Sequence, residues 1–149
     1  LYPSFFDSNT DGVVMETKQY PIKWQKRFAF FDTYGAPKTP EHKAAIKQQP
    51  YFARFLIMFN FFAYFFGPIY FAIVGLWKKA LILLAISLCI TMLFATIELI
   101  IGREFPRPVW TAISLGVSFM WGFTANYAYY LKKVKGLDGW NPFEGFSLY

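Results

Sequence analysis

Residues 55–79 read FLIMFNFFAYFFGPIYFAIVGLWKK, and this stretch decides how the chain folds. Aromatic residues dominate it, because eleven of the twenty-one residues from Tyr51 to Phe71 are Phe or Tyr. A bilayer crossing takes about 20 apolar residues, so residues 55–76 are long enough to cross. We predict that they instead enter the membrane and return to the same side, as an aromatic re-entrant or interfacial helical hairpin.

A glycine–proline step interrupts this stretch. Pro68 lacks a backbone N–H and disfavours helix at the residue before it, Gly67. The step therefore predicts two short helices, 55–66 and 69–76, separated by a break. Because hydrocarbon offers no hydrogen-bonding partner, the backbone groups freed at the break must be buried in protein or reach water.

Polar residues near both ends of the stretch also favour re-entry. Asn60 would place an amide in hydrocarbon if the segment crossed. A crossing would also have to reverse within Trp77, Lys78 and Lys79, since the next apolar segment follows directly. Such a connection is at the short end of the about 2–8 residues that usually join neighbouring helices.

The composition indicates an integral membrane protein. Hydrophobic residues make up 56% of the 149 residues and aromatic residues 23%, which is more than an ordinary soluble domain contains. The length favours a single domain. The net charge of +6 is explained by basic flanks that face anionic headgroups, so we expect no nucleic-acid partner. The single cysteine, Cys89, excludes an intrachain disulfide. No basic region followed by an apolar core begins the chain, so we expect no cleavable signal peptide.

Two later segments are predicted to be transmembrane helices. Residues 80–101 form a helix of about 33 Å, enough to cross a bilayer, and residues 109–131 are similarly long and apolar. Small or polar residues recur every four positions along both: Ser87, Thr91 and Ala95 on the first, and Ser114, Ser118, Gly122 and Asn126 on the second. Such stripes let membrane helices approach closely. We expect the two stripes to face each other in an antiparallel hairpin closed by residues 102–108.

The chain before this region predicts a polar extension, residues 1–19, and two helices. An aromatic stripe at helical spacing predicts the first helix, 20–34: Tyr20, Trp24, Phe28 and Phe31. This N-terminal amphipathic helix suits either the headgroup region or packing on the protein's own helices. A Thr-Pro-Glu sequence then predicts the start of a second helix, 40–49. We expect both helices on the cytoplasmic side or at the interface.

Two features could suggest a metal site. Asp7, Asn9 and Asp11 match the first half of a calcium loop of the EF-hand type. Lys18 stands where the bidentate glutamate belongs and would repel the ion, so we interpret the segment as a loop of Asx turns. His42, the only histidine, falls in the first turn of the helix 40–49, and we expect it on the surface. We therefore predict no metal and no cofactor.

Polar residues within the apolar segments are candidate functional residues. Glu98 is the only ionisable residue inside a predicted span, and such carboxylates are functional candidates. The structural alternative is that Glu98 reaches the interface or pairs with Arg103 or Arg107. Asn60 and Asn126 could hydrogen-bond to each other and clamp the hairpin to the last span.

Counting Lys and Arg predicts the orientation. If residues 55–76 re-enter, one side of the membrane holds 13 basic residues and the other holds 2, whereas a crossing gives 10 and 5. The positive-inside rule favours the first arrangement, with both termini cytoplasmic. Residues 136–149 are rich in glycine and aromatic residues, and we expect a loosely held tail.

Four short motifs suggest a family. They are W-x-x-R-F-x-F-F at 24–31, N-x-x-A-x-F-F-G-P-x-Y at 60–70, G-x-W-K-K at 75–79 and N-x-x-Y-Y at 126–130. These motifs resemble a bacterial inner-membrane family known as domain of unknown function 2628 (DUF2628). The resemblance covers about residues 20–135, which we predict to be a single membrane domain. It implies a small integral membrane protein and implies no activity.

We therefore predict an all-α integral membrane protein with two transmembrane helices. The sequence contains no serine–histidine–acid set and no phosphate loop, so we expect no enzyme. The favoured function is an accessory or interaction subunit of a membrane protein assembly, which contacts lipids and either another membrane protein or a second copy of itself. The alternatives are a small transporter or ion-pathway subunit that uses Glu98, and a module that binds a lipid or quinone.

Overall fold

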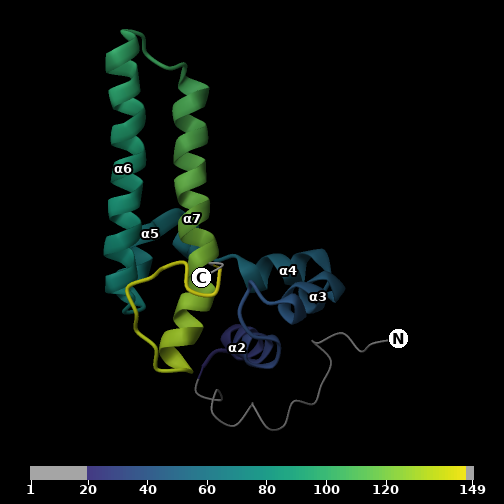
Figure 1. Ribbon diagram of the computed structural model, residues 1–149. Coiled ribbons are helices and arrows are strands. Elements are labelled where there is room, and N and C mark those ends of the chain that lie inside the picture. Colours follow the sequence, from purple (N-terminus) through teal and green to yellow (C-terminus); the bar gives the residue numbers. More distant parts are fainter. Residues whose placement is uncertain (1–19, 147–149) are drawn as a thin grey trace. The chain divides into compact units, whose positions relative to one another are not determined.

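A computed structural model describes residues 20–146 of the chain (Figure 1). The regular structure in this part is helical throughout, which confirms the all-α prediction. The helices are α2 (Ile22–Tyr34), α3 (Pro40–Gln48), α4 (Tyr51–Met58), α5 (Phe61–Ile73), α6 (Trp77–Ile101) and α7 (Arg107–Lys133).

The chain divides into two compact units. In the described part, the first unit comprises residues 20–59, 126–137 and 143–146, and the second comprises Asn60–Ala125 and Asp138–Pro142. Helix α7 contributes to both, because its last two turns belong to the first unit and the rest to the second.

Aromatic side chains build the core of the first unit. The predicted stripe on α2 supplies Trp24, Phe28 and Phe31, and the end of α7 supplies Tyr127 and Tyr130. The ring centroids of Phe31 and Tyr127 are 5.2 Å apart, and those of Phe28 and Tyr130 are 6.0 Å apart. Of the two interpretations of this stripe, packing on the protein's own helices is therefore the one that the structure supports.

Helix α3 begins as predicted, but its histidine does not lie on the surface. Thr39 Oγ1 accepts a hydrogen bond from the backbone N–H of His42 at 3.3 Å. The prediction that His42 is exposed was wrong, because only 1% of the residue is accessible. The turn after α2 folds α3 back onto the aromatic face, so that the ring of His42 meets Phe30 edge-on at 5.1 Å and stacks on Phe31 at 5.7 Å.

The aromatic stretch contains a break that was not predicted, between Met58 and Phe61. Helix α4 ends at Met58 and α5 begins after Asn60, so the predicted continuous helix over 55–66 was wrong. The cause is Asn60, whose backbone is extended and whose Oδ1 accepts from the N–H of Ala63 at 3.2 Å. Asparagine is among the preferred N-cap residues, and here it starts a new helix.

The predicted break at Gly67 is present as a kink within α5. Gly67 has φ +30° and ψ −106°, far from helical values, and Pro68 follows it inside the helix. A β-carbon built on Gly67 would lie 3.3 Å from the ring of Trp121. The kink thus depends on glycine both for its backbone conformation and for the close approach of the indole.

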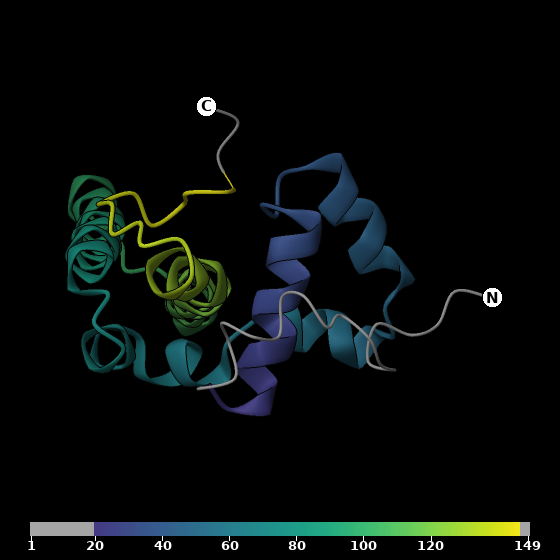
Figure 2. The ribbon, with the colours of Figure 1, turned by 90° about the horizontal axis from the view of Figure 1, so that it is seen from below.

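Helices α6 and α7 run antiparallel and side by side over the second unit (Figure 1), and Figure 2 shows them nearly end on. The prediction that their small-residue stripes face each other was wrong, because Thr91, Ala95 and Ser114 are exposed. The hydroxyls of Ser87 and Thr91 donate to carbonyls one turn earlier in the same helix, at 2.7 and 3.0 Å, so they need no partner across the pair. The less exposed positions of α6 carry bulky residues, namely Leu83, Ile86, Ile90 and Phe94, as well as the small residues Ala80 and Ser87.

Two helical stretches in the described residues are long and apolar enough to cross a membrane. One is Trp77–Ile101, which is the first predicted span, and the other is Tyr51–Ile73, which was predicted to re-enter. The second of these is not one straight helix, because it is interrupted between α4 and α5 and kinked at Gly67. Helix α7 has 27 residues but is less apolar than α6, so its predicted role as a span is not supported by hydropathy alone.

The kink predicts that replacing Gly67 lowers stability more than replacing Gly116. Gly67→Ala should destabilise the protein by about 1–3 kcal/mol, because alanine resists a positive φ and its β-carbon crowds Trp121. Gly116→Ala, in α7, is the matched control, since a β-carbon there meets nothing within 4 Å. Thermal unfolding in detergent measures both. Equal melting temperatures for the two variants would contradict this account of the kink.

Candidate functional site

In the first unit, the side-chain amide of Asn126 binds the C-terminal end of α4. Asn126 Nδ2 donates to the carbonyl oxygens of Ile57 at 2.9 Å, Phe59 at 3.1 Å and Leu56 at 3.3 Å. The last carbonyls of a helix have no partner within the helix, and Asn126 is 1% exposed, so water does not supply one. The side chain of Asn126 thus caps the C-terminal end of α4 from another helix.

In the second unit, the side-chain amide of Asn60 caps the start of α5. Besides capping α5, Asn60 donates through Nδ2 to the hydroxyl of Tyr70 at 2.9 Å, and its backbone N–H donates to the carbonyl of Gly122 at 3.0 Å. Both asparagines that the sequence singled out therefore pair backbone groups at helix ends. The predicted hydrogen bond between the two amides stays a prediction.

The start of α6 is tied to the segment that follows α7. Lys79 is fully buried and its Nζ donates to the carbonyl of Asn141 at 2.7 Å. Lys78 forms an ion pair with Asp138 at 3.5 Å. The ring of Trp77 meets Trp140 edge-on at 5.5 Å. The prediction of a loosely held tail was therefore wrong for residues 138–141, because a buried ammonium group needs acceptors and this segment provides one.

Glu98 closes the connection between α6 and α7. Its Oε1 accepts from the backbone N–H of Phe105 at 2.5 Å and from the indole N–H of Trp110 at 3.0 Å. No ion pair joins Glu98 to Arg103 or Arg107, so the structure does not support the second of the two structural alternatives, and the first, that Glu98 reaches the interface, stays a prediction. The carboxylate instead fixes the loop, since both partners lie at or just after the turn.

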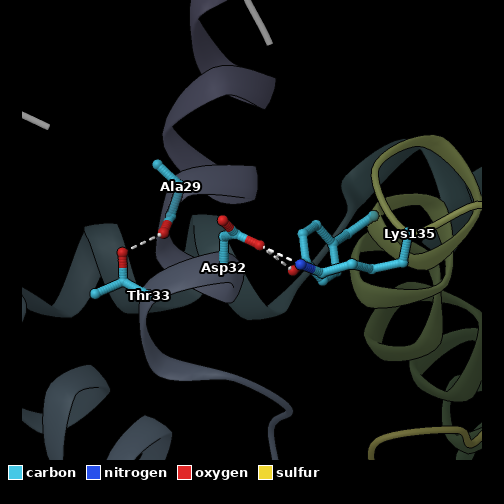
Figure 3. A network of polar contacts seen from close by, with 5 residues as sticks. Ala29, Asp32, Thr33 and Lys135 are labelled. Carbon is cyan, nitrogen blue, oxygen red and sulfur yellow. Dashed lines mark hydrogen bonds and ion pairs between the residues drawn. The ribbon is translucent and has the colours of Figure 1, made fainter. Parts of the chain in front are cut away.

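A polar network that the sequence analysis missed joins α2 to the end of α7 in the first unit (Figure 3). Asp32 Oδ1 accepts from Lys135 Nζ at 2.5 Å and from the hydroxyl of Tyr130 at 2.9 Å. The hydrogen bond from Lys135 is the main reason that the pKa of Asp32 is lowered. One turn of α2 is also closed by Thr33, whose hydroxyl donates to the carbonyl of Ala29 at 2.8 Å. An aspartate 103 positions from its lysine carries no pattern that a sequence could reveal.

His42 is an uncharged part of the core rather than a ligand. Its Nδ1 lies 3.0 Å from the carbonyl oxygen of Gly35, and its Nε2 lies 3.4 Å from Met58 Sδ. Burial lowers the pKa of His42, and the hydrogen bond with the Gly35 carbonyl opposes this only in part. The ring is therefore neutral at pH 7.

The remaining candidates lie apart from these groups. Pro68 is exposed. Within residues 20–146, no three side chains of His, Cys, Asp or Glu are placed to hold a metal ion. The half-matched calcium loop, with Asp7, Asn9 and Asp11, lies outside the described residues.

Comparison with known proteins agrees with the motifs. The model of a family described as "Protein of unknown function (DUF2628)" matches residues 11–135, so the match begins earlier than the motifs alone indicated. "Uncharacterized protein YigF" of Escherichia coli (strain K12) is 35% identical over 123 residues, which cover 80% of this chain and 89% of that protein. The proteins of the same description from Salmonella typhimurium and Salmonella typhi are 34% identical over the same shares. No solved structure matches the chain.

The contacts of Asn126 predict a large effect on stability. Asn126→Ala should lower the free energy of unfolding by about 2–3 kcal/mol, because the carbonyls of the buried Ile57 and Phe59 lose this donor. Gln48→Ala, which removes an exposed amide from α3, should change it by less than about 0.5 kcal/mol. Chemical denaturation in detergent measures both values, and similar values for the two variants would contradict the capping role.

The burial of His42 predicts a pH dependence. Its folded-state pKa lies below the ordinary value of 6.5, so the unfolded chain binds the proton first as the pH falls. Stability should therefore be complete above 6.5 and decline below it, by at most about 1.4 kcal/mol per pH unit. The contribution of Asp32, whose folded-state pKa is lowered, is lost only below its ordinary pKa of 3.8, so it does not add to the decline between pH 6.5 and that value.

Denaturation between pH 7 and about pH 5 tests this, since the unperturbed carboxyl groups titrate lower. In His42→Gln, which keeps a donor for Gly35 but does not titrate, the decline should disappear. An unchanged decline in that variant would assign it to another group.

Proposed function

Since the chain belongs to the DUF2628 family of proteins of unknown function, we propose that it is a non-catalytic integral protein of the bacterial inner membrane that binds another membrane protein. The proposal rests chiefly on one observation. The exposed apolar surface of α5 is largely aromatic, whereas that of α6 is aliphatic apart from Trp77 at its first position.

The exposure of α6 supports membrane insertion. In the most apolar 18 residues of α6, only 6% are buried within the protein. In the corresponding part of Tyr51–Ile73, 33% are buried. The apolar helix of a soluble core would be mostly buried, because exposed apolar area is unfavourable in water. A helix of 25 residues is also about 37 Å long, enough for a bilayer.

Contacts within each unit support the re-entrant arrangement. In the first unit α2 packs on the end of α7, through Phe31, Tyr127 and the ion pair of Asp32. In the second unit the start of α6 is tied through Lys79 to Asn141, a few residues after α7. If α6 crosses the membrane and α7 returns, the chain before and after the aromatic stretch then lies on one side. The positive-inside rule makes that side cytoplasmic.

The side chains on α5 support a protein partner. Its exposed residues include Phe61, Phe62, Phe65, Phe66, Ile69 and Ile73. On α6 the exposed large residues are Trp77 at its first position and, along the rest of the helix, Leu81, Leu84, Leu88, Met92, Leu93, Leu99, Ile100 and Ile101. Flexible aliphatic side chains match acyl chains, whereas aromatic residues are enriched at protein interfaces, where rigid rings bury much area at little entropic cost. We therefore assign the α5 face to a partner and the α6 face to lipid.

The polar groups support a non-catalytic role. Asn126, Asn60 and Glu98 each pair with backbone or indole groups at helix ends or in the loop between α6 and α7. The contacts of Glu98 favour a loop anchor over the proton- or ion-carrying group of a transporter. Structural contacts explain why these polar residues are present. The exposed aromatic surface of α5 is therefore the remaining candidate for a functional surface.

Photo-crosslinking tests the partner surface. Phe65→p-benzoylphenylalanine, at a position 71% exposed, should give a discrete protein adduct in native membranes. Leu88→p-benzoylphenylalanine on α6 is the matched control and should react with lipid alone. Substitutions of Phe62 and Ile69 extend the scan along the same face. If none of the three α5 positions gives a protein adduct, the proposed partner surface is wrong.

A further inference from the structure

Two half-exposed tryptophans meet at the start of α6 in the second unit. Trp77 is the first residue of α6, and Trp140 lies in the segment that follows α7 (Figure 1). Their rings meet edge-on at 5.5 Å, and about half of each residue is exposed. The pair therefore presents a large apolar surface that carries polar N–H groups at its edge.

The segment that carries Trp140 is held in place by polar contacts. Lys78 Nζ donates to the carbonyl oxygen of Asp138 at 3.2 Å and lies 3.5 Å from its carboxylate. The fully buried Lys79 donates through Nζ to the carbonyl oxygen of Asn141 at 2.7 Å. Trp140 lies between these two contacts, so its position beside α6 is already fixed. A side chain that is already ordered loses less entropy when it binds a neighbour.

The indole N–H groups distinguish this pair from the tryptophan at the other end of the two long helices. There, the indole N–H of Trp110 donates to Glu98. Within residues 20–146, the indole N–H of neither Trp77 nor Trp140 donates a hydrogen bond. The surroundings of the pair must therefore supply acceptors for the N–H groups as well as an apolar medium for the rings. The boundary between headgroups and acyl chains of a bilayer supplies both, and tryptophan is enriched there.

The length of α6 matches the distance between the two boundaries of a bilayer. Trp77 and Glu98 are 21 residues apart in this helix, and the carboxylate of Glu98 contacts Trp110. A rise of 1.5 Å per residue gives about 32 Å, and the hydrocarbon core is about 30 Å thick. When α6 crosses the membrane, Trp77 thus lies at one boundary and Trp110 near the other.

We propose that Trp77 and Trp140 together bind the bilayer at the boundary between headgroups and acyl chains. Their rings contact the first acyl carbons, and their N–H groups donate to oxygen atoms of the lipids. This inference rests on the proposed membrane location of α6 and adds that the segment after α7 binds lipid. The model of the family ends at residue 135, so Trp140 lies outside the part of the chain that it matches.

The consequence of this contact is a fixed depth for the second unit. An indole pair at the boundary resists movement of α6 in either direction along its axis, because the rings would enter water or the N–H groups would enter hydrocarbon. Helix α5 contacts α6 and precedes it by three residues. The anchor would therefore also hold the aromatic face of α5 at one depth.

Quenching by brominated lipids measures the depth of each tryptophan. The full chain is reconstituted in vesicles of phosphatidylcholine that is brominated either near the headgroup or near the end of the acyl chain. The difference in emission between the unchanged protein and Trp140→Phe reports on Trp140. We expect this emission to be quenched, and more strongly by the bromine atoms near the headgroup. Trp110→Phe is the matched control and should give the same order, since Trp110 lies near the opposite boundary.

A cysteine one turn into α6 measures whether the pair fixes depth. In a Cys89→Ala background, Leu81→Cys is labelled with a membrane-impermeant maleimide in opened membranes. Adding Trp140→Ala should raise the labelling rate about 2- to 10-fold, the range expected for the loss of one aromatic pair. Adding Leu137→Ala, which removes a side chain of similar exposure from the preceding turn, should leave the rate within about twofold.

The outcomes separate this proposal from the proposed function. Quenching of Trp110 without quenching of Trp140 would overturn the anchor and leave the membrane location intact. Stronger quenching of Trp140 by the deeper bromine atoms, or equal labelling rates in Trp140→Ala and Leu137→Ala, would also overturn it. Quenching of neither tryptophan would contradict the membrane location and the anchor with it. Photo-crosslinking at Phe65 bears only on the protein partner, which the vesicles do not contain.

Discussion

The structure depends on one constraint, which is that a helix can end inside an apolar region only where other groups of the protein pair its free carbonyls and N–H groups. Asn126 supplies the donor at the end of α4, and Asn60 supplies the acceptor at the start of α5. These two amides allow an aromatic stretch that is long enough to cross a bilayer to break into two short helices. Without them the same residues would favour one continuous span, which satisfies its own backbone.

The broken stretch is consistent with the contacts that surround it. The aromatic core of the first unit holds α2 and the end of α7 together, and Lys79 holds the start of α6 to the segment after α7. The exposed apolar surfaces of two helices differ in chemistry, because that of α6 is aliphatic apart from Trp77 and that of α5 is largely aromatic. In the proposed function, the first surface meets acyl chains and the second meets a protein partner.

Features set by local chemistry were predictable from the sequence, and features set by tertiary contacts were not. Pro68 fixed a break in α5, and Thr39 fixed the start of α3, because both act on their nearest neighbours. Asn60 was recognised as unusual, but a buried amide and a helix cap have the same sequence signature, so the second break was missed. The burial of His42 and the ties of Lys79 and Asp32 follow from how distant segments pack. The prediction that the small-residue stripes face each other did not take into account that the hydroxyls of Ser87 and Thr91 donate to carbonyls of their own helix.

The most direct measurement is the side of the membrane on which the chain lies before and after the aromatic stretch. In a Cys89→Ala background, single cysteines at Lys43, Glu104 and Lys133 are labelled in intact cells with a membrane-impermeant maleimide. A stretch that enters and returns predicts that only the cysteine at Glu104 reacts, while those at Lys43 and Lys133 react after the cells are opened. If the cysteines at Lys43 and Lys133 are found on opposite sides, the stretch crosses the membrane and the account is wrong.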